Sequence, residues 1–287
     1  MTDLRPATYQ RLRIVTALVI AAVVLSGSIL VTIYARTGGF RRGISYEEGA
    51  ILDVSPSMEG GISVVGDNVQ IFVESNSQEH TTVRLDTAGF REDTRASPHT
   101  VGLRVDSSVG GATNQITVTV PTGGTLVLTL VGEARMLLDR VQLHVLRLTG
   151  ASAALEMDVS IPGSIVDSVT LDGIAGDFRG VRLGNLNFSE FIIGSVAGNY
   201  DLDLSGALER HGDVVVRSAL GDGVIRVPSK PGAEIRIGSV LGRVTATGLS
   251  SSGTRSFFNT AASLGAEHQL FVDINSTIGK IQLLEVQ

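Results

Sequence analysis

The feature that most constrains the fold is a sequence pattern that recurs about every 22 residues. Residues 191–204 read FIIGSVAGNYDLDL, residues 235–248 read IRIGSVLGRVTATG, and a weaker copy, VVVRSALGDGVIRV, occupies residues 214–227. With the central glycine of each copy as an index, the frame falls successively on Ala153, Gly176, Gly198, Gly221, Gly242 and Gly279. The first four intervals are 23, 22, 23 and 21 residues, and the last, of 37, equals one repeat plus an insertion near 249–265.

Each copy alternates apolar residues on both sides of the index position. The residues seven and five positions before the index are apolar in every copy: Leu146 and Leu148, Val169 and Leu171, Phe191 and Ile193, Val214 and Val216, Ile235 and Ile237, and Val272 and Ile274. Alternation with a period of two is typical of strands, but one copy alone cannot bury its apolar row. Copies stacked about 4.8 Å apart would bury it, which predicts an all-β repeat fold, a β-solenoid with rungs of about 22 residues. A β-sandwich is the alternative, but it has no reason to repeat one side-chain sequence at one spacing.

The two residues before each index position predict a corner in the rung. The pairs Ala219–Leu220 and Val240–Leu241 break the alternation, so both side chains would face inward only if the backbone bends between them. Glycine permits such a bend and a close approach to the next rung. We therefore expect both members of each pair inside the solenoid and the index glycines stacked at its corner.

The chain divides into five predicted parts. Residues 1–13 form a cytoplasmic tail, 14–34 a transmembrane helix, 35–45 a tether, 46–135 an N-terminal β region, and 136–287 the solenoid repeats with the insertion near 249–265. Residues 46–135 alternate in segments such as NQITVTVP but lack the index pattern, so they form either a cap of atypical rungs or a small separate β domain.

The transmembrane prediction rests on an uncharged run of 21 residues, Ile14 to Tyr34, long enough to cross roughly 30 Å of hydrocarbon as a helix. A buried core helix and a cleaved signal peptide are the alternatives, but the run is longer than a usual signal-peptide core. Three arginines precede the run and three follow it closely, so the positive-inside rule gives no orientation. We expect a single-pass membrane protein whose C-terminal body is extracytoplasmic.

Composition argues against several classes of function. A net charge of −6 with scattered arginines predicts no nucleic-acid partner, and the absence of cysteine excludes disulfides and thiolate chemistry. The histidines, which are His80, His99, His144, His211 and His268, show no zinc-ligand spacing. No nucleophile elbow or phosphate loop is present, and the GDG at 221–223 reads as a turn. We therefore predict no catalytic, cofactor-binding or metal residues and no cofactor.

The densest acidic stretch, DLDLSGALERHGD, gives the one weak candidate site. Leu202 and Leu204 would point inward, so Asp201 and Asp203 would project together from the outer face. With Glu209, His211 and Asp213, this pair would suit a calcium ion or acid–base catalysis, but such pairs are usually a solvated strand face.

The rungs FIIGSVAGNYDLDLSG, VVVRSALGDGVIRVPSKPGAEIRIGSVLGRV and FVDINSTIGKIQL, after one N-terminal span, resemble the bacterial envelope β-solenoids known as "putative adhesin" or toast-rack domains. The resemblance covers about 140 to 287. It implies a right-handed coil at the cell envelope with non-enzymatic roles in adhesion, scaffolding or envelope-stress signalling, and no transferable active-site residues. The polar stretch 86–114 and the insertion near 249–265 depart from the family pattern.

These observations predict a membrane-anchored, non-enzymatic binding, adhesion or scaffold module. Its expected partners are the lipid bilayer, through residues 14–34, and an envelope protein or a cell-wall polymer. One alternative is a scaffold that self-associates through the open ends of its ladder. The other is a polysaccharide-active β-helix enzyme, which would need carboxylates converging in a groove.

Overall fold

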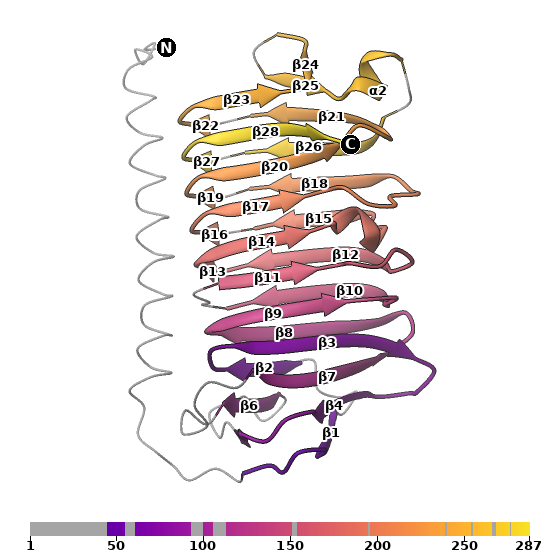
Figure 1. The fold of residues 1–287 in the computed structure, drawn as a ribbon, viewed down its shortest axis with the longest axis vertical. Helices are drawn as coiled ribbons and strands as arrows, with labels where there is room; N and C mark the ends of the chain where they lie inside the picture. Colours follow the sequence, from indigo (N-terminus) through magenta and orange to yellow (C-terminus); the bar gives the residue numbers. More distant parts are fainter. Residues whose placement is uncertain are drawn as a thin grey trace, which may run out of the picture.

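The computed structural model describes residues 45–54, 61–92, 100–105, 113–150, 154–194, 196–217, 219–238, 240–253, 255–265, 268–275 and 277–287. The predicted tail, membrane span and nearly all of the tether lie outside these residues. Within the described part of the chain, no helix is both long enough and apolar enough to cross a membrane. What the structure shows is a mostly β protein whose long parallel sheets form a stack of rungs, consistent with a β-solenoid (Figure 1).

Three sheets make up the walls of the stack. Sheet A has 12 strands, in the order β24 (Ser250–Ser251), β25 (Ser256–Phe258), β21 (Gly232–Ile237), β26 (His268–Ile274), β18 (Gly212–Val216), β15 (Glu190–Ile193), β12 (Ile165–Asp172), β10 (Gln142–Thr149), β8 (Gly124–Val131), β2 (Ile62–Val65), β6 (Val101–Val105) and β5 (Phe90–Glu92).

Sheet B has 11 strands, in the order β1 (Ile51–Val54), β4 (Thr81–Leu85), β7 (Asn114–Pro121), β3 (Val69–Asn76), β9 (Glu133–Leu138), β11 (Ala154–Asp158), β14 (Asp177–Val181), β17 (Tyr200–Asp203), β20 (Gly223–Pro228), β28 (Ile281–Val286) and β23 (Val244–Thr247). Sheet C is narrow, with 5 strands in the order β13 (Ile174–Ala175), β16 (Val196–Ala197), β19 (Ala219–Leu220), β27 (Thr277–Ile278) and β22 (Val240–Leu241). Residues on both sides of position 135 contribute strands to sheets A and B.

The interior is a column of apolar side chains, as the repeat predicts. The residues seven and five positions before each index are all buried, and the most exposed of them, Ile237, is only 6% exposed. They lie in register from rung to rung, for example Val169 beside Phe191 and Phe191 beside Val214. Since one buried aliphatic side chain contributes about 1.5–3 kcal/mol, such columns supply much of the folding free energy.

The index glycines stack at the corner between sheets C and B. A Cβ atom placed on Gly198 would overlap the carbonyl oxygen of Gly176, and one on Gly221 would overlap that of Gly198. Gly221 also has φ +137°, which side chains rarely allow. The expected stacking of glycines is therefore confirmed.

The expectation that both residues before the glycine face inward is wrong for the second one. Ala219 is buried, but Leu220 is only half-buried, because the pair forms a strand of its own in sheet C. Neighbouring side chains of a strand point to opposite faces, so in this two-residue strand of sheet C the first side chain points inward and the second outward. The alternation is therefore kept, because sheet C forms a short third wall of the stack.

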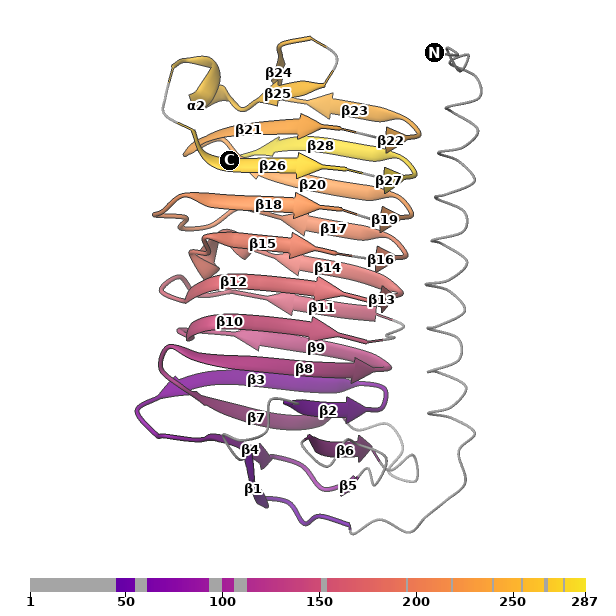
Figure 2. The same cartoon turned by 180° about the vertical axis from the view of Figure 1, so that it is seen from behind.

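The rungs do not follow chain order at either end of the stack. The last rung of the chain lies inside the stack: β26 pairs with both β18 and β21, β27 with β19 and β22, and β28 with β20 and β23. At the other end, β2 lies between β6 and β8, and β3 lies between β7 and β9. Figures 1 and 2 show both exchanges, with the yellow C-terminal rung between orange rungs.

Antiparallel strands cover sheet A at one end of the stack and sheets A and B at the other. The insertion near 249–265 forms β24, β25 and the short helix α2 (Thr260–Ser263), and β25 runs antiparallel to β21. The buried Asn259 side chain donates to the carbonyls of Pro228 (2.7 Å) and Pro231 (2.6 Å) and accepts from the N–H groups of Ala233 (3.0 Å) and Ala262 (2.9 Å). At the other end, β4 runs antiparallel to β7, and β5 to β6.

Candidate functional site

The outer face of sheet B carries a row of alternating charges in register. Arg135 of β9 pairs with Glu156 of β11, Glu156 with Arg179 of β14, and Arg179 with Asp201 of β17. The Glu156 carboxylate lies 3.1 Å from Arg135 Nε and 3.4 Å from Arg179 Nη1. These positions face outward because the inner neighbours Leu155, Phe178 and Tyr200 fill the core.

The ion pairs on this row fix the direction of the side chains. Arg135 Nη2 also lies 2.8 Å from Asp158, whose side chain is only 10% exposed, while Asp201 pairs with Arg226. Exposed ion pairs contribute little to the free energy of folding, about 0–1 kcal/mol each. Their main effect here is to hold charged groups in a regular array.

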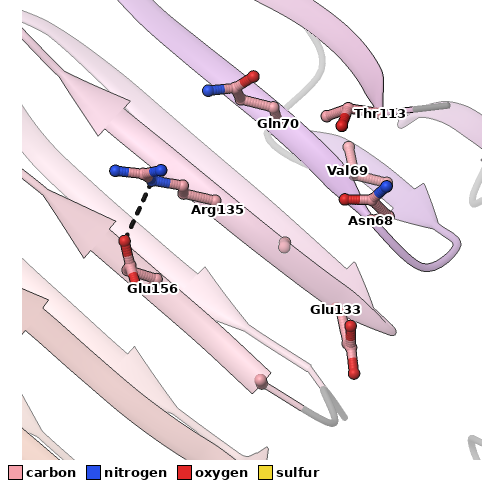
Figure 3. A pocket seen from close by; sticks show the side chains of 9 residues that line it. Asn68, Val69, Gln70, Thr113, Glu133, Arg135 and Glu156 are labelled. Atoms are coloured by element: carbon pink, nitrogen blue, oxygen red, sulfur yellow. Dashed lines mark ion pairs between the residues drawn. The ribbon is translucent and has the colours of Figure 1, made fainter.

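A hollow of about 310 Å³ lies at the β3 end of this row (Figure 3). Its polar lining comes from strands β3, β9 and β11 and from the residues just before β3 and β7: Asn68, Gln70, Thr113, Glu133, Arg135 and Glu156. Figure 3 shows Arg135 directed toward Glu156 across the strands, with Glu133 at the side of the hollow near Asn68. Two carboxylates, one guanidinium and two amides give the hollow both hydrogen-bond donors and acceptors.

An aromatic side chain lies beside these groups on the same strand. Phe72 follows Gln70 by two residues in β3, so both side chains project from the outer face, between the buried Ile71 and Val73. Phe72 is half-buried and lies in register with Leu137 and Thr117. The same face therefore offers an apolar surface next to polar groups.

The acidic stretch predicted from the sequence is split between two walls. Asp201 and Asp203 do project from sheet B, as expected, since Leu202 and Leu204 are buried. Asp203 accepts from the N–H of Ser205 at 3.0 Å. Asp213 lies on sheet A, and the ring of His211 lies against Phe271 at 5.2 Å between centroids. The five residues do not form one site, and no group of three or more His, Asp or Glu residues within the described ranges is arranged to hold a metal ion.

A second polar cluster joins three segments near the N-terminal ends of β10 and β12, two neighbouring strands of sheet A. Asp167 of β12 lies 2.9 Å from His144 Nδ1 of β10 and 2.8 Å from Nη1 of Arg210, which follows β17. The hydrogen bond with His144 and then that with Arg210 lower the pKa of Asp167 below its usual value. This cluster ties neighbouring rungs together at the surface.

Sequence reasoning missed the hollow and the charge row. The signal for the row was present, because Glu156, Arg179 and Asp201 each lie three residues after an index position. The hollow had no such signal, since Asn68, Gln70 and Thr113 belong to a region outside the repeat frame.

No family model matches the chain, and no curated protein matches it. Among solved structures, one that matches is described as a "putative cell adhesion protein from Clostridium sporogenes ATCC 15579". It superposes with a TM-score of 0.38 at 14% identity and covers 84% of this chain and 100% of that chain. The chain therefore has a distant structural similarity to that protein.

Proposed function

We propose that this protein is a non-enzymatic binding module of the cell envelope, which presents the outer face of sheet B to a cell-wall polymer. Residues 14–34 would anchor it in the membrane by a single span, with the C-terminal body outside the cytoplasm. The observation that carries the proposal is the hollow bordered by Asn68, Gln70, Glu133, Arg135 and Glu156. Phe72 projects from the same face, two residues beyond Gln70 on β3.

The chemistry of this face suits a polymer rich in hydroxyl and amide groups. Such a ligand needs donors and acceptors at fixed spacing, and the amides, carboxylates and guanidinium of the hollow provide both. An aromatic ring next to polar groups also suits a sugar, which has apolar C–H faces and polar edges. Since the groups stand on paired strands of one sheet, little entropy is lost in positioning them.

The first experiment asks on which side of the membrane the body lies. Intact cells carrying the full-length protein with a C-terminal tag are treated with protease, beside a cytoplasmic control protein. We expect the tag to be removed. Retention of the tag would overturn the extracytoplasmic placement and favour an inward-facing scaffold.

The second experiment tests the binding face. The full-length protein in detergent is incubated with purified cell walls, and the bound fraction is compared for Phe72→Ala, Arg135→Gln and Arg226→Gln. Arg226 is the matched control, because it projects from the same sheet but pairs with Asp201 away from the hollow. We expect the first two variants to lose binding by about fivefold or more and the control to retain it. Equal binding by all variants, or release of sugar fragments by the wild type, would contradict the proposal.

A further inference from the structure

The corner of the solenoid repeats one backbone hydrogen bond from rung to rung. Each index glycine donates its N–H to the carbonyl of the residue before the next glycine in the stack. The bonds run from Gly176 to Ala197 (2.9 Å), Gly198 to Leu220 (2.8 Å), Gly221 to Ile278 (2.9 Å) and Gly279 to Leu241 (3.0 Å).

A second bond repeats two residues further along each rung. In this series, an N–H group donates to a carbonyl of the next rung: Phe178 to Asn199 (2.9 Å), Tyr200 to Asp222 (3.0 Å), Gly223 to Lys280 (2.8 Å) and Ile281 to Arg243 (2.8 Å). Both series end at the rung of β22 and β23, where Gly242 and Val244 hold the donor positions. Among the described residues, no acceptor is found for either N–H group.

Within the part of the chain that the structure describes, this rung is therefore an open edge of sheets B and C. Sheet B ends at β23 and sheet C at β22, whereas the neighbouring end of sheet A is covered by β25 and β24. Thr245, Ala246 and Thr247 are exposed, and β23 contains no charge, no proline and no bulge. The one charged residue of the edge, the exposed Arg243, lies at the corner between β22 and β23. Proteins usually protect an exposed edge with one of these features, because its unpaired backbone groups readily pair with another strand.

We infer that the open edge of β22 and β23, residues 240–247, binds an extended segment of a partner polypeptide as an additional strand. The segment lies parallel to β23, turns the corner with the rung, and accepts hydrogen bonds from the N–H groups of Gly242 and Val244. This interaction is separate from polymer binding on the outer face of sheet B. Main-chain bonds would supply the affinity, as in other cases of strand addition to a sheet edge.

The corner gives the partner segment a specific requirement. A Cβ atom on Gly242 would overlap the carbonyl oxygen of Gly279, and Gly279, Gly221 and Gly198 have the same relation to the glycine before them in the stack. The residue opposite Gly242 must therefore be glycine as well. In this chain, the two residues before the glycine are uncharged and small or aliphatic, so the partner segment should carry two such residues beside the half-buried Val240 and Leu241.

A second copy of the solenoid, stacked end to end, fits this edge less well than a single strand. Figures 1 and 2 show β24, β25 and α2 rising beyond β23 at this end of the stack. They stand beside the open edge and would meet a second stack before its strands reached β23. A single extended segment needs only the edge itself.

The test uses a synthetic peptide that copies residues 214–228 of this chain. In the stack, the carbonyls of Leu220 and Asp222 in this segment accept from Gly198 and Tyr200, which are equivalent to Gly242 and Val244. Hydrogen exchange of the full-length protein in detergent is followed by NMR with and without the peptide. The N–H groups of Gly279 and Ile281, which are bonded within the stack, serve as internal references.

Without peptide, we expect Gly242 and Val244 to exchange rapidly and the references to be protected. With peptide, exchange at Gly242 and Val244 should slow about tenfold or more, and a peptide with valine in place of its central glycine should have no effect. Protection of Gly242 and Val244 in the absence of peptide would overturn the inference, because the edge would already be covered. The inference would also be overturned if both peptides slowed exchange at Gly242 and Val244 equally, or if neither peptide slowed it.

A variant gives an independent check. The N–H of Ala246 has the same outward direction as that of Val244, so Ala246→Pro removes an edge donor and no bond to β28. Thr245→Pro instead removes a bond to β28. We expect Ala246→Pro to keep the melting temperature and lose peptide protection at Val244, and Thr245→Pro to lower the melting temperature. Undiminished peptide protection in a folded Ala246→Pro protein would contradict the inference.

Discussion

The carbonyl oxygen of Gly279 lies against the Cα of Gly242, so closely that a Cβ atom on Gly242 would overlap it. Gly242 precedes Gly279 by more than one repeat in the chain, yet Gly279 stands between Gly221 and Gly242 in the stack. The last rung of the chain is thus held by parallel strands on both sides. The rung of β21, β22 and β23 can form its hydrogen bonds to the stack only when residues 268–287 are in place.

Truncation of a side chain in this inserted rung should cost more than truncation in the rung at the open edge. Leu283 is buried and lies between Ile225 and Ala246, while Val244 is half-buried at the end of sheet B. We expect Leu283→Ala to lower the free energy of unfolding by about 2–5 kcal/mol and Val244→Ala by about 1 kcal/mol or less. Denaturant titration measures both, and equal losses would argue against the inserted position.

A large and a small residue compensate each other in the core column of sheet B. The ring of Tyr200 fills the space above Gly223, where a Cβ atom would overlap the ring. We expect Gly223→Ala to destabilise the protein by about 1–3 kcal/mol through overpacking. In a Tyr200→Leu background, the same change should cost clearly less, since the smaller side chain leaves room. Additive effects in this double-mutant cycle would show that the two residues do not share the space.

Much of this architecture could be predicted from the sequence, because alternation and the glycine spacing report directly on local geometry. The buried pairs before each index, such as Phe191 and Ile193, follow from alternation alone. The order of the rungs could not be predicted. Rungs with similar sequences can stack on one another in any order, because the repeated pattern does not specify which rung pairs with which. The hollow near Gln70 depends on where rungs outside the repeat frame come to lie, so local pattern did not reveal it.

Substitution of a corner glycine should reduce stability in two ways, through its close contact with the next rung and through its backbone conformation, and two variants separate these contributions. Gly221 and Gly123 both have positive φ, at +137° and +73°, but a Cβ atom on Gly221 would overlap the Gly198 carbonyl, whereas one on Gly123 meets nothing within 4 Å. Gly123→Ala should cost about 1–2 kcal/mol for the backbone conformation alone. Gly221→Ala should cost more, because the stacked rungs must also move apart. Thermal unfolding of the two variants measures the difference, and a smaller loss for Gly221→Ala would contradict the tight corner.

Acid should weaken the cluster of His144, Asp167 and Arg210. Because hydrogen bonds from His144 and Arg210 lower the pKa of Asp167 in the folded state, its ionised form stabilises the fold. That contribution is complete above the unfolded pKa of about 4 and is lost as pH falls through the lower folded value. We expect Asp167→Asn to destabilise the protein near neutral pH and to approach the wild-type melting temperature as pH drops below about 4. Asp213→Asn, an exposed carboxylate on the same sheet, is the control. A difference between wild type and Asp167→Asn that stays constant down to the most acidic pH would show that Asp167 acts through packing rather than charge.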